Sequence, residues 1–162
     1  MSLLIMTLVS VLLVSGMDAV IKTYRKSVNA ANAQTLVSTA VTELRNELSF
    51  ASEVEYKDGK ICYRSSDGML CSISNGTGPA AGNAVAEELF PGLCLTRGGV
   101  KKELVSSAAS TELVCRIGDV TCSKETSSVT IADLIVYEAG KGADSPLASV
   151  ESLVIDVQTV KK

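Results

Sequence analysis

The first 17 residues of the chain form a continuous apolar run without a charged side chain. The run reads MSLLIMTLVSVLLVSGM, and its polar members are small hydroxyl residues that can bond back to helix carbonyls. Extended through Ile21, it gives about 31 Å of helix, which is close to the hydrocarbon thickness of a bilayer. The pattern predicts that residues 1–21 are the membrane-spanning half of a helix.

Three interpretations of this run stand side by side. A buried core helix would normally show one polar face. A cleaved secretory signal needs a basic segment before the apolar run and a small-x-small cleavage site, for which Val14-Ser15-Gly16 is the nearest match. A retained membrane anchor fits the length, and we favour it.

The charges that follow the run complicate the orientation of such an anchor. Lys22, Arg25 and Lys26 come directly after it, and the positive-inside rule would place the C-terminal part in the cytoplasm. Five cysteines favour an oxidising compartment instead. A basic leader ahead of the apolar run would remove the conflict.

A helical pattern continues beyond the apolar run, because no Gly or Pro occurs between Gly16 and Gly59. Apolar residues recur there at steps of three and four, which we interpret as one stripe: Val20, Tyr24, Val28, Val37, Val41, Leu44, Leu48 and Ala51, widened by Leu36 and Ala40. Polar residues occupy the opposite face: Lys22, Lys26, Asn29, Asn32, Thr39, Glu43 and Asn46. We therefore expect one helix from near residue 2 to about residue 54, with residues 22–54 as its amphipathic half.

Residues 55–162 change to short β-type runs separated by Gly, Asp, Asn and Ser, which predicts a β-rich globular domain. Strands are expected at residues 54–56, 60–64, 69–73, 93–96, 112–117, 128–138 and 149–160. Residues 74–92 read as a loop with a helical turn at 84–90. The fold class is α+β, with the long helix packed on a small antiparallel sheet.

Two disulfides are suggested by the spacing of the cysteines. Cys62 and Cys71 would lie opposite each other if the hairpin turn centres on Ser66-Asp67, and the pairing fails if the turn centres on Asp67-Gly68. Cys115 and Cys122 flank Gly118-Asp119 in a similar way. Cys94 would then have no partner. The alternative is that all five cysteines are small buried hydrophobic residues without disulfides.

Composition argues against several classes of chemistry. The chain has 162 residues, a formal net charge of −3 and no His. A mildly acidic balance without a basic run predicts no nucleic-acid partner. Without His the chain lacks the commonest general base and metal ligand, and no CxxC pair suggests zinc. We find no catalytic, metal or cofactor residues and expect a protein that is not an enzyme.

Asp18 is unusual because it places a charge near the end of the apolar segment. Lys22, one helical turn further on, is the local partner that we expect for it. A basic group of a neighbouring subunit is the alternative partner.

The overall layout resembles the type IV pilin and type II secretion pseudopilin class. The local motif is Met6-Thr7-Leu8-Val9-Ser10 with the apolar run behind it, which is similar to the segment at the prepilin cleavage point. Two segments of the β-rich part, YKDGKICY (56–63) and LASVESLVIDV (147–157), resemble small pilin-like proteins of Gram-positive anaerobes. Ser10 stands where the family usually has Glu, which suits a minor or tip subunit better than a major one.

The resemblance implies a bacterial cell-surface structural subunit. Such a subunit is held in the cell membrane by a single span, its C-terminal domain is extracytoplasmic, and it assembles into a filament with other pilin-like subunits on an assembly platform protein. Met6, Thr7, Leu8, Val9, Ser10, Gly16 and Asp18 would lie on the assembly helix. The rival hypothesis is a single-pass anchored extracytoplasmic domain that binds a partner without assembling.

Overall fold

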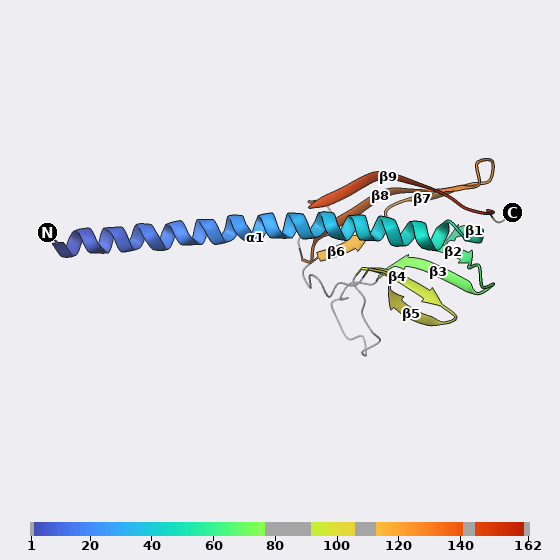
Figure 1. Ribbon diagram of the computed structural model, residues 1–162, viewed down its shortest axis with the longest axis horizontal. Helices are drawn as coiled ribbons and strands as arrows, with labels where there is room; N and C mark the ends of the chain where they lie inside the picture. The colour runs from blue at the N-terminus through green and yellow to red at the C-terminus, as the bar shows by residue number, and fades with distance from the viewer. Residues whose placement is uncertain (1, 77–91, 106–112, 141–144, 161–162) are drawn as a thin grey trace.

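The structure, a computed structural model, describes residues 2–76, 92–105, 113–140 and 145–160, with the backbone alone for residues 2–5 and 7–15. Within these residues, one long helix is followed by nine strands in two antiparallel sheets (Figure 1). The α+β class is thus confirmed. The sequence led us to expect one small sheet, whereas the strands divide into a five-stranded and a four-stranded sheet. The helical turn expected at residues 84–90 lies outside the described residues.

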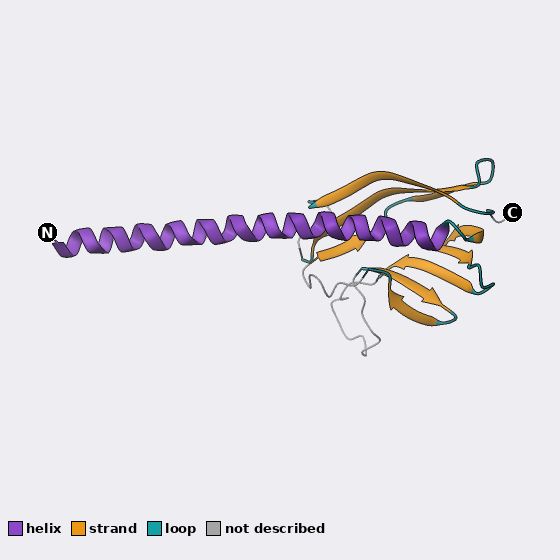
Figure 2. Cartoon of the chain, in the orientation of Figure 1, coloured by secondary structure: helices purple, strands orange, loops and turns teal. Residues whose placement is uncertain are grey.

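Helix α1 (Ser2–Leu48) is continuous over 47 residues, as the absence of Pro and mid-helix Gly beyond Gly16 predicts. It ends six residues before the expected boundary. There the amide of Ala51 donates to the carbonyl of Leu48, and the carbonyl of Ala51 accepts from the amide of Gln158. Figure 2 shows that both sheets lie beside the C-terminal half of α1, while its N-terminal half extends alone.

The five-stranded sheet is a meander of β1 (Ser52–Lys57), β2 (Lys60–Arg64), β3 (Leu70–Asn75), β4 (Leu93–Arg97) and β5 (Val100–Glu103), in that order. Asp58 and Gly59 both have positive φ in the two-residue β1–β2 turn, as a type I′ hairpin requires. Gly98 and Gly99 do the same between β4 and β5. That Gly-Gly pair was the available signal for β5, which our sequence interpretation missed.

The four-stranded sheet is built around β8 (Ser128–Glu138), which pairs with β9 (Ala148–Asp156) along one edge. Along the other edge β6 (Leu113–Arg116) and β7 (Val120–Ser123) lie end to end. Both keep the same register on β8, since Arg116 lies opposite Ile135 and Val120 lies opposite Ile131. The chain therefore does not reverse at Gly118-Asp119, and the turn expected there is wrong.

Gly118 sits at the junction of β6 and β7 because no side chain fits there. Its amide lies 3.2 Å from the carbonyl oxygens of both Ala132 and Asp133. A Cβ at this position would lie 2.9 Å from the Ala132 oxygen. Asp133 itself has a φ of 54°, so the edge of β8 is locally distorted where the junction contacts it.

The core lies where the C-terminal half of α1 meets both sheets. The helix contributes Ala33, Val37, Ala40, Leu44 and Leu48, and Leu36 and Val41 pack at its margin. The sheets contribute mainly β-branched and leucine side chains: Val54, Ile61, Ile73, Val129, Ile131, Leu134, Val136, Leu153 and Ile155. This confirms the part of the predicted stripe that runs from Val37 to Ala51.

Two polar links hold the layers in place. The Tyr63 hydroxyl on β2 donates to a carboxylate oxygen of Glu47 on α1 at 2.8 Å. The Asn75 side chain joins the two sheets, because its Nδ2 donates to the Ile117 carbonyl at 2.7 Å and its Oδ1 accepts from the Ile117 amide at 2.9 Å. Asn75 also opens an Asn-Gly-Thr sequence of the glycosylation type, yet its amide nitrogen is already engaged in this link.

Both predicted disulfides are wrong, because all five cysteines are thiols. Cys62 lies opposite Ser72 and Cys71 lies opposite Tyr63, so the two thiols belong to opposite faces of the sheet. Cys115 lies opposite Val136, whereas Cys122 lies opposite Val129. Seven strand positions correspond to about 23 Å, far beyond the reach of a disulfide.

Candidate functional site

The N-terminal half of α1 carries the most conspicuous exposed apolar surface of the described chain. Residues 16–27, called the projecting segment below, are exposed at every position. Met17, Val20 and Tyr24 are 68%, 67% and 69% exposed, and Ile21 is 44% exposed. Large apolar side chains gathered on one short segment indicate an interaction surface rather than ordinary surface scatter.

The apolar side of the projecting segment faces away from the sheets. Our sequence interpretation joined Val20, Tyr24 and Val28 to Val37 and the residues after it in a single stripe. Val28 and Val37 are nine residues apart, which is about two and a half helical turns, so they lie on opposite sides of α1. The exposures agree, because Val37 is 7% exposed while Tyr24 is 69% exposed. The single stripe is therefore wrong, and the helix has two apolar sides.

The predicted assembly residues lie along the same half of α1. Met6 is 73% exposed, and Gly16 and Asp18 are exposed. A Cβ added at Gly16 would meet nothing within 4 Å, so the helix there is open to close approach. The side chains of Thr7, Leu8, Val9 and Ser10 lie outside the described residues.

The local partner expected for Asp18 is not engaged. Among the described residues Arg64 pairs with Glu53 at 3.2 Å and Arg97 pairs with Asp67 at 3.1 Å, whereas no ion pair joins Asp18 to Lys22. All the charges of the projecting segment are exposed, namely Asp18, Lys22, Arg25 and Lys26. They give the segment a net positive charge at the end of the apolar run.

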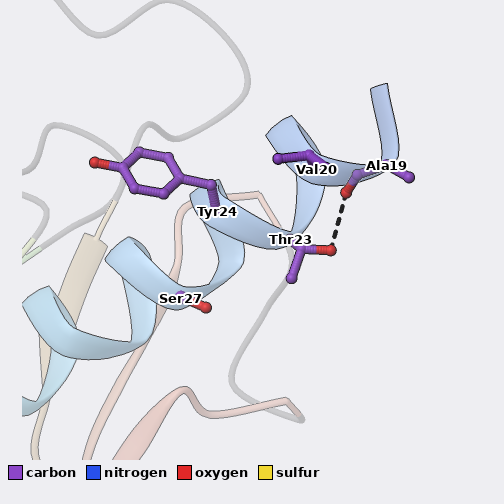
Figure 3. A pocket seen from close by; sticks show the side chains of 5 residues that line it. All are labelled: Ala19, Val20, Thr23, Tyr24 and Ser27. Atoms are coloured by element: carbon purple, nitrogen blue, oxygen red, sulfur yellow. Dashed lines mark hydrogen bonds between the residues drawn. The ribbon is translucent and has the colours of Figure 1, made fainter. Parts of the chain in front are cut away.

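A shallow hollow lies beside Tyr24 on the same segment (Figure 3). Small side chains surround it, since Ala19, Thr23 and Ser27 line it together with Val20 and Tyr24. The Thr23 hydroxyl donates to the Ala19 carbonyl at 2.9 Å. The hydroxyl is thereby satisfied within the helix, and the hollow offers mainly apolar contact.

Burial disfavours the thiolate form of three of the five cysteines, Cys94, Cys115 and Cys122. Burial raises the pKa of Cys115 to about 12, and burial also raises the pKa of Cys94 and of Cys122. A cysteine acts as a nucleophile through its thiolate, which these surroundings disfavour at neutral pH. In the part of the chain that the structure describes, no three His, Cys, Asp or Glu residues are grouped so as to hold a metal ion.

A second hollow, on the outer side of the five-stranded sheet, is polar. Lys60, Ser74, Thr96 and Lys101 line it beside the β1–β2 turn. Ammonium and hydroxyl groups can donate hydrogen bonds there, and Asp58 and Asn75 add acceptor oxygens to the lining.

Within the described residues, no helix has the length and apolar character needed to cross a membrane. Comparisons with models of known protein families, with curated proteins and with solved structures returned no match.

The sequence pattern identified the apolar residues of the projecting segment, but not that they face away from the sheets. The signal was present, because the step from Val28 to Val37 breaks the spacing of three and four that holds on either side. The Tyr63–Glu47 and Asn75–Ile117 links had no comparable signal, because they depend on how distant elements meet.

Proposed function

We propose that this protein is a membrane-anchored pilin-like structural subunit, a minor pilin or pseudopilin, that assembles through α1 into a type IV pilus-like or type II secretion filament. The observation that carries the proposal is the exposed apolar side of the projecting segment, which faces away from the chain's own sheets. Met17, Val20 and Tyr24 have no place in the core of this domain.

The proposal gives this surface two successive environments. In the membrane, the charge-free run of residues 1–17 is solvated by lipid, and Lys22, Arg25 and Lys26 follow it at the interface, where long basic side chains can reach the headgroups. In the filament, the same run packs against equivalent helices of other subunits. Assembly then exchanges lipid contact for helix contact, and small residues such as Gly16 and Ala19 permit close approach.

The remaining parts of the chain follow from this role. The two sheets would form the extracytoplasmic domain, at the cell surface or on the outside of a filament. Other pilin-like subunits and an assembly platform protein would be the partners. No part of this role requires a catalytic residue, a metal or a cofactor.

Photo-cross-linking in membranes tests the proposal against a single-pass anchored domain that does not assemble. A photoreactive amino acid is placed at Val20, and a control is placed at Lys102, which is exposed on β5. The proposal predicts that the chain fractionates with membranes and gives a ladder of oligomers from Val20 but not from Lys102. Membrane-bound monomer alone would favour the non-assembling domain, and a chain absent from membranes would contradict both.

A further inference from the structure

The exposed side of α1 carries a heptad-spaced line of residues. Eight positions alternate at steps of four and three, and we call them the exposed seam: Met17, Ile21, Tyr24, Val28, Ala31, Thr35, Ser38 and Thr42. Val28 is half-buried and the other seven are exposed. A repeat of 3.5 residues keeps such a line on one side of a helix that winds around a partner.

The exposed seam continues beside the packed half of the helix. Over residues 33–48, α1 buries Ala33, Val37, Ala40, Leu44 and Leu48 in the domain core. The seam residues of the same stretch, Thr35, Ser38 and Thr42, are exposed on the other side. The chain's own sheets therefore leave this part of the seam exposed.

The chemistry of the exposed seam suits burial against another helix. None of its eight residues is charged, and four alternate members are β-branched: Ile21, Val28, Thr35 and Thr42. In a parallel coiled coil this is the preference of the a position. The smaller Ala31 and Ser38 allow two helix axes to approach closely.

The threonine hydroxyls of the seam do not oppose burial. Thr35 donates to the Ala31 carbonyl at 3.1 Å, and Thr42 donates to the Ser38 carbonyl at 2.9 Å. These two threonine hydroxyls already have a partner within their own helix, so a second helix can cover them without leaving an unsatisfied donor.

The flanks of the seam are also compatible with a second copy. On one side lie Val20, Ser27, Gln34 and Val41, which carry no charge. On the other side, Asp18 and Arg25 have opposite signs and are followed by Asn32 and Thr39. The two charges on the flanks of the seam therefore cancel, while Lys22 and Lys26 lie outside these flanks.

We propose that the exposed seam is the contact by which α1 packs in parallel against the exposed seam of a second copy of this chain, from Met17 to Thr42. This inference rests on the proposed function, because anchoring by the same end in one membrane makes the helices parallel. It extends the contact beyond the apolar half of the helix, into the half that carries the sheets. The occupant is a second copy because the seam carries no charge and its two flanking charges, Asp18 and Arg25, have opposite signs, so its chemistry is compatible with an identical seam.

The test compares two threonines of the same helix in the full chain in membranes. Thr35 lies on the seam and donates to Ala31, while Thr23 lies off the seam and donates to Ala19 in the same way. Both are exposed, so neither Thr35→Glu nor Thr23→Glu disturbs the core. The readout is the yield of oligomers cross-linked from a photoreactive residue at Val20.

We expect Thr35→Glu to lower the oligomer yield by at least about tenfold, because copies would bury like charges against each other. Thr23→Glu should change it by less than about twofold, and Thr35→Ser should retain the wild-type ladder. If Thr35→Glu leaves the ladder intact, or if both glutamates abolish it, the seam is not the contact although assembly stands. If the wild-type chain gives no ladder, the proposed function itself fails.

Discussion

Two stretches of one helix, the projecting segment (residues 16–27) and the packed segment (residues 33–48), have opposite environments although the helix between them is unbroken. In the packed segment, Leu44 and Leu48 are fully buried in the core that α1 shares with the sheets. In the projecting segment, the large apolar residues are exposed. The difference shows that helix continuity is a local property of the chain, whereas the fate of each apolar side chain depends on which side it occupies.

The comparison also separates the stability of the domain from its association with a neighbouring molecule. Burial of the packed segment stabilises this domain by removing apolar surface from water. The projecting segment contributes nothing of that kind to an isolated chain, and its apolar area is available for a neighbouring molecule. Mutations in the two stretches should therefore affect different measurements.

The largest contrast is expected between Leu44→Ala and Ile21→Ala. Leu44 is fully buried, so its truncation should lower the free energy of unfolding by about 2–5 kcal/mol. Ile21 is 44% exposed, and its truncation should change the free energy of unfolding by less than about 0.5 kcal/mol. Urea denaturation followed by circular dichroism measures both, and equal losses would contradict the division of the helix.

A pair of glycines sharpens the same division. Gly118→Ala would place a Cβ 2.9 Å from the Ala132 oxygen and should destabilise the domain by about 1–3 kcal/mol. Gly16→Ala meets nothing within 4 Å and should leave the domain within about 0.5 kcal/mol of wild type. A stable Gly118→Ala variant would show that the β6–β7 junction differs from the one described.

The hydrogen bond between Tyr63 and Glu47 joins the packed segment of α1 to the five-stranded sheet. Tyr63→Phe removes a bond to a carboxylate and should cost about 1–2 kcal/mol, reduced because Glu47 is only partly buried. Tyr56→Phe is the matched control, since Tyr56 is 40% exposed. If the two variants have the same denaturation midpoint, the hydrogen bond of Tyr63 does not stabilise the domain.

A smaller effect is expected on the free energy of unfolding of the domain at alkaline pH. Burial raises the pKa of Cys115 from 9.0 to about 12, so the folded state holds this proton longer than the unfolded chain. The contribution of Cys115 is complete below about pH 9 and is lost as the pH rises towards 12.

Unfolding free energies under reducing conditions between pH 8 and about 11 test this linkage. The wild type should lose stability over that range more steeply than Cys115→Ala. Parallel curves for the two proteins would mean that Cys115 does not retain its proton on folding.

The sequence allowed the helix and the strand pattern to be predicted because both depend on local periodicity. The apolar spacing from Val37 to Ala51 and the alternation in β8 are visible without any tertiary information. Register is different, since a one-residue change in the turn between β2 and β3 moved Cys62 to the face opposite Cys71. Nothing local distinguishes a turn at Gly118-Asp119 from a strand that continues past a junction.

The candidate site was predictable in part. The exposed residues of the projecting segment were expected to lie on one helix face, but that face was placed on the core side. The nine-residue step from Val28 to Val37 would have separated the two sides. The meeting of Asn75 with Ile117 could not be foreseen, because it joins two sheets that are distant in sequence.

The most direct test of the account is amide hydrogen exchange along α1, measured for the detergent-dispersed chain and for the chain assembled in membranes. We predict strong protection of residues 33–48 in both states, and weak protection of residues 16–27 that rises on assembly. Residues 16–27 protected to the same extent before and after assembly would contradict the claim that this stretch is an interface awaiting other copies.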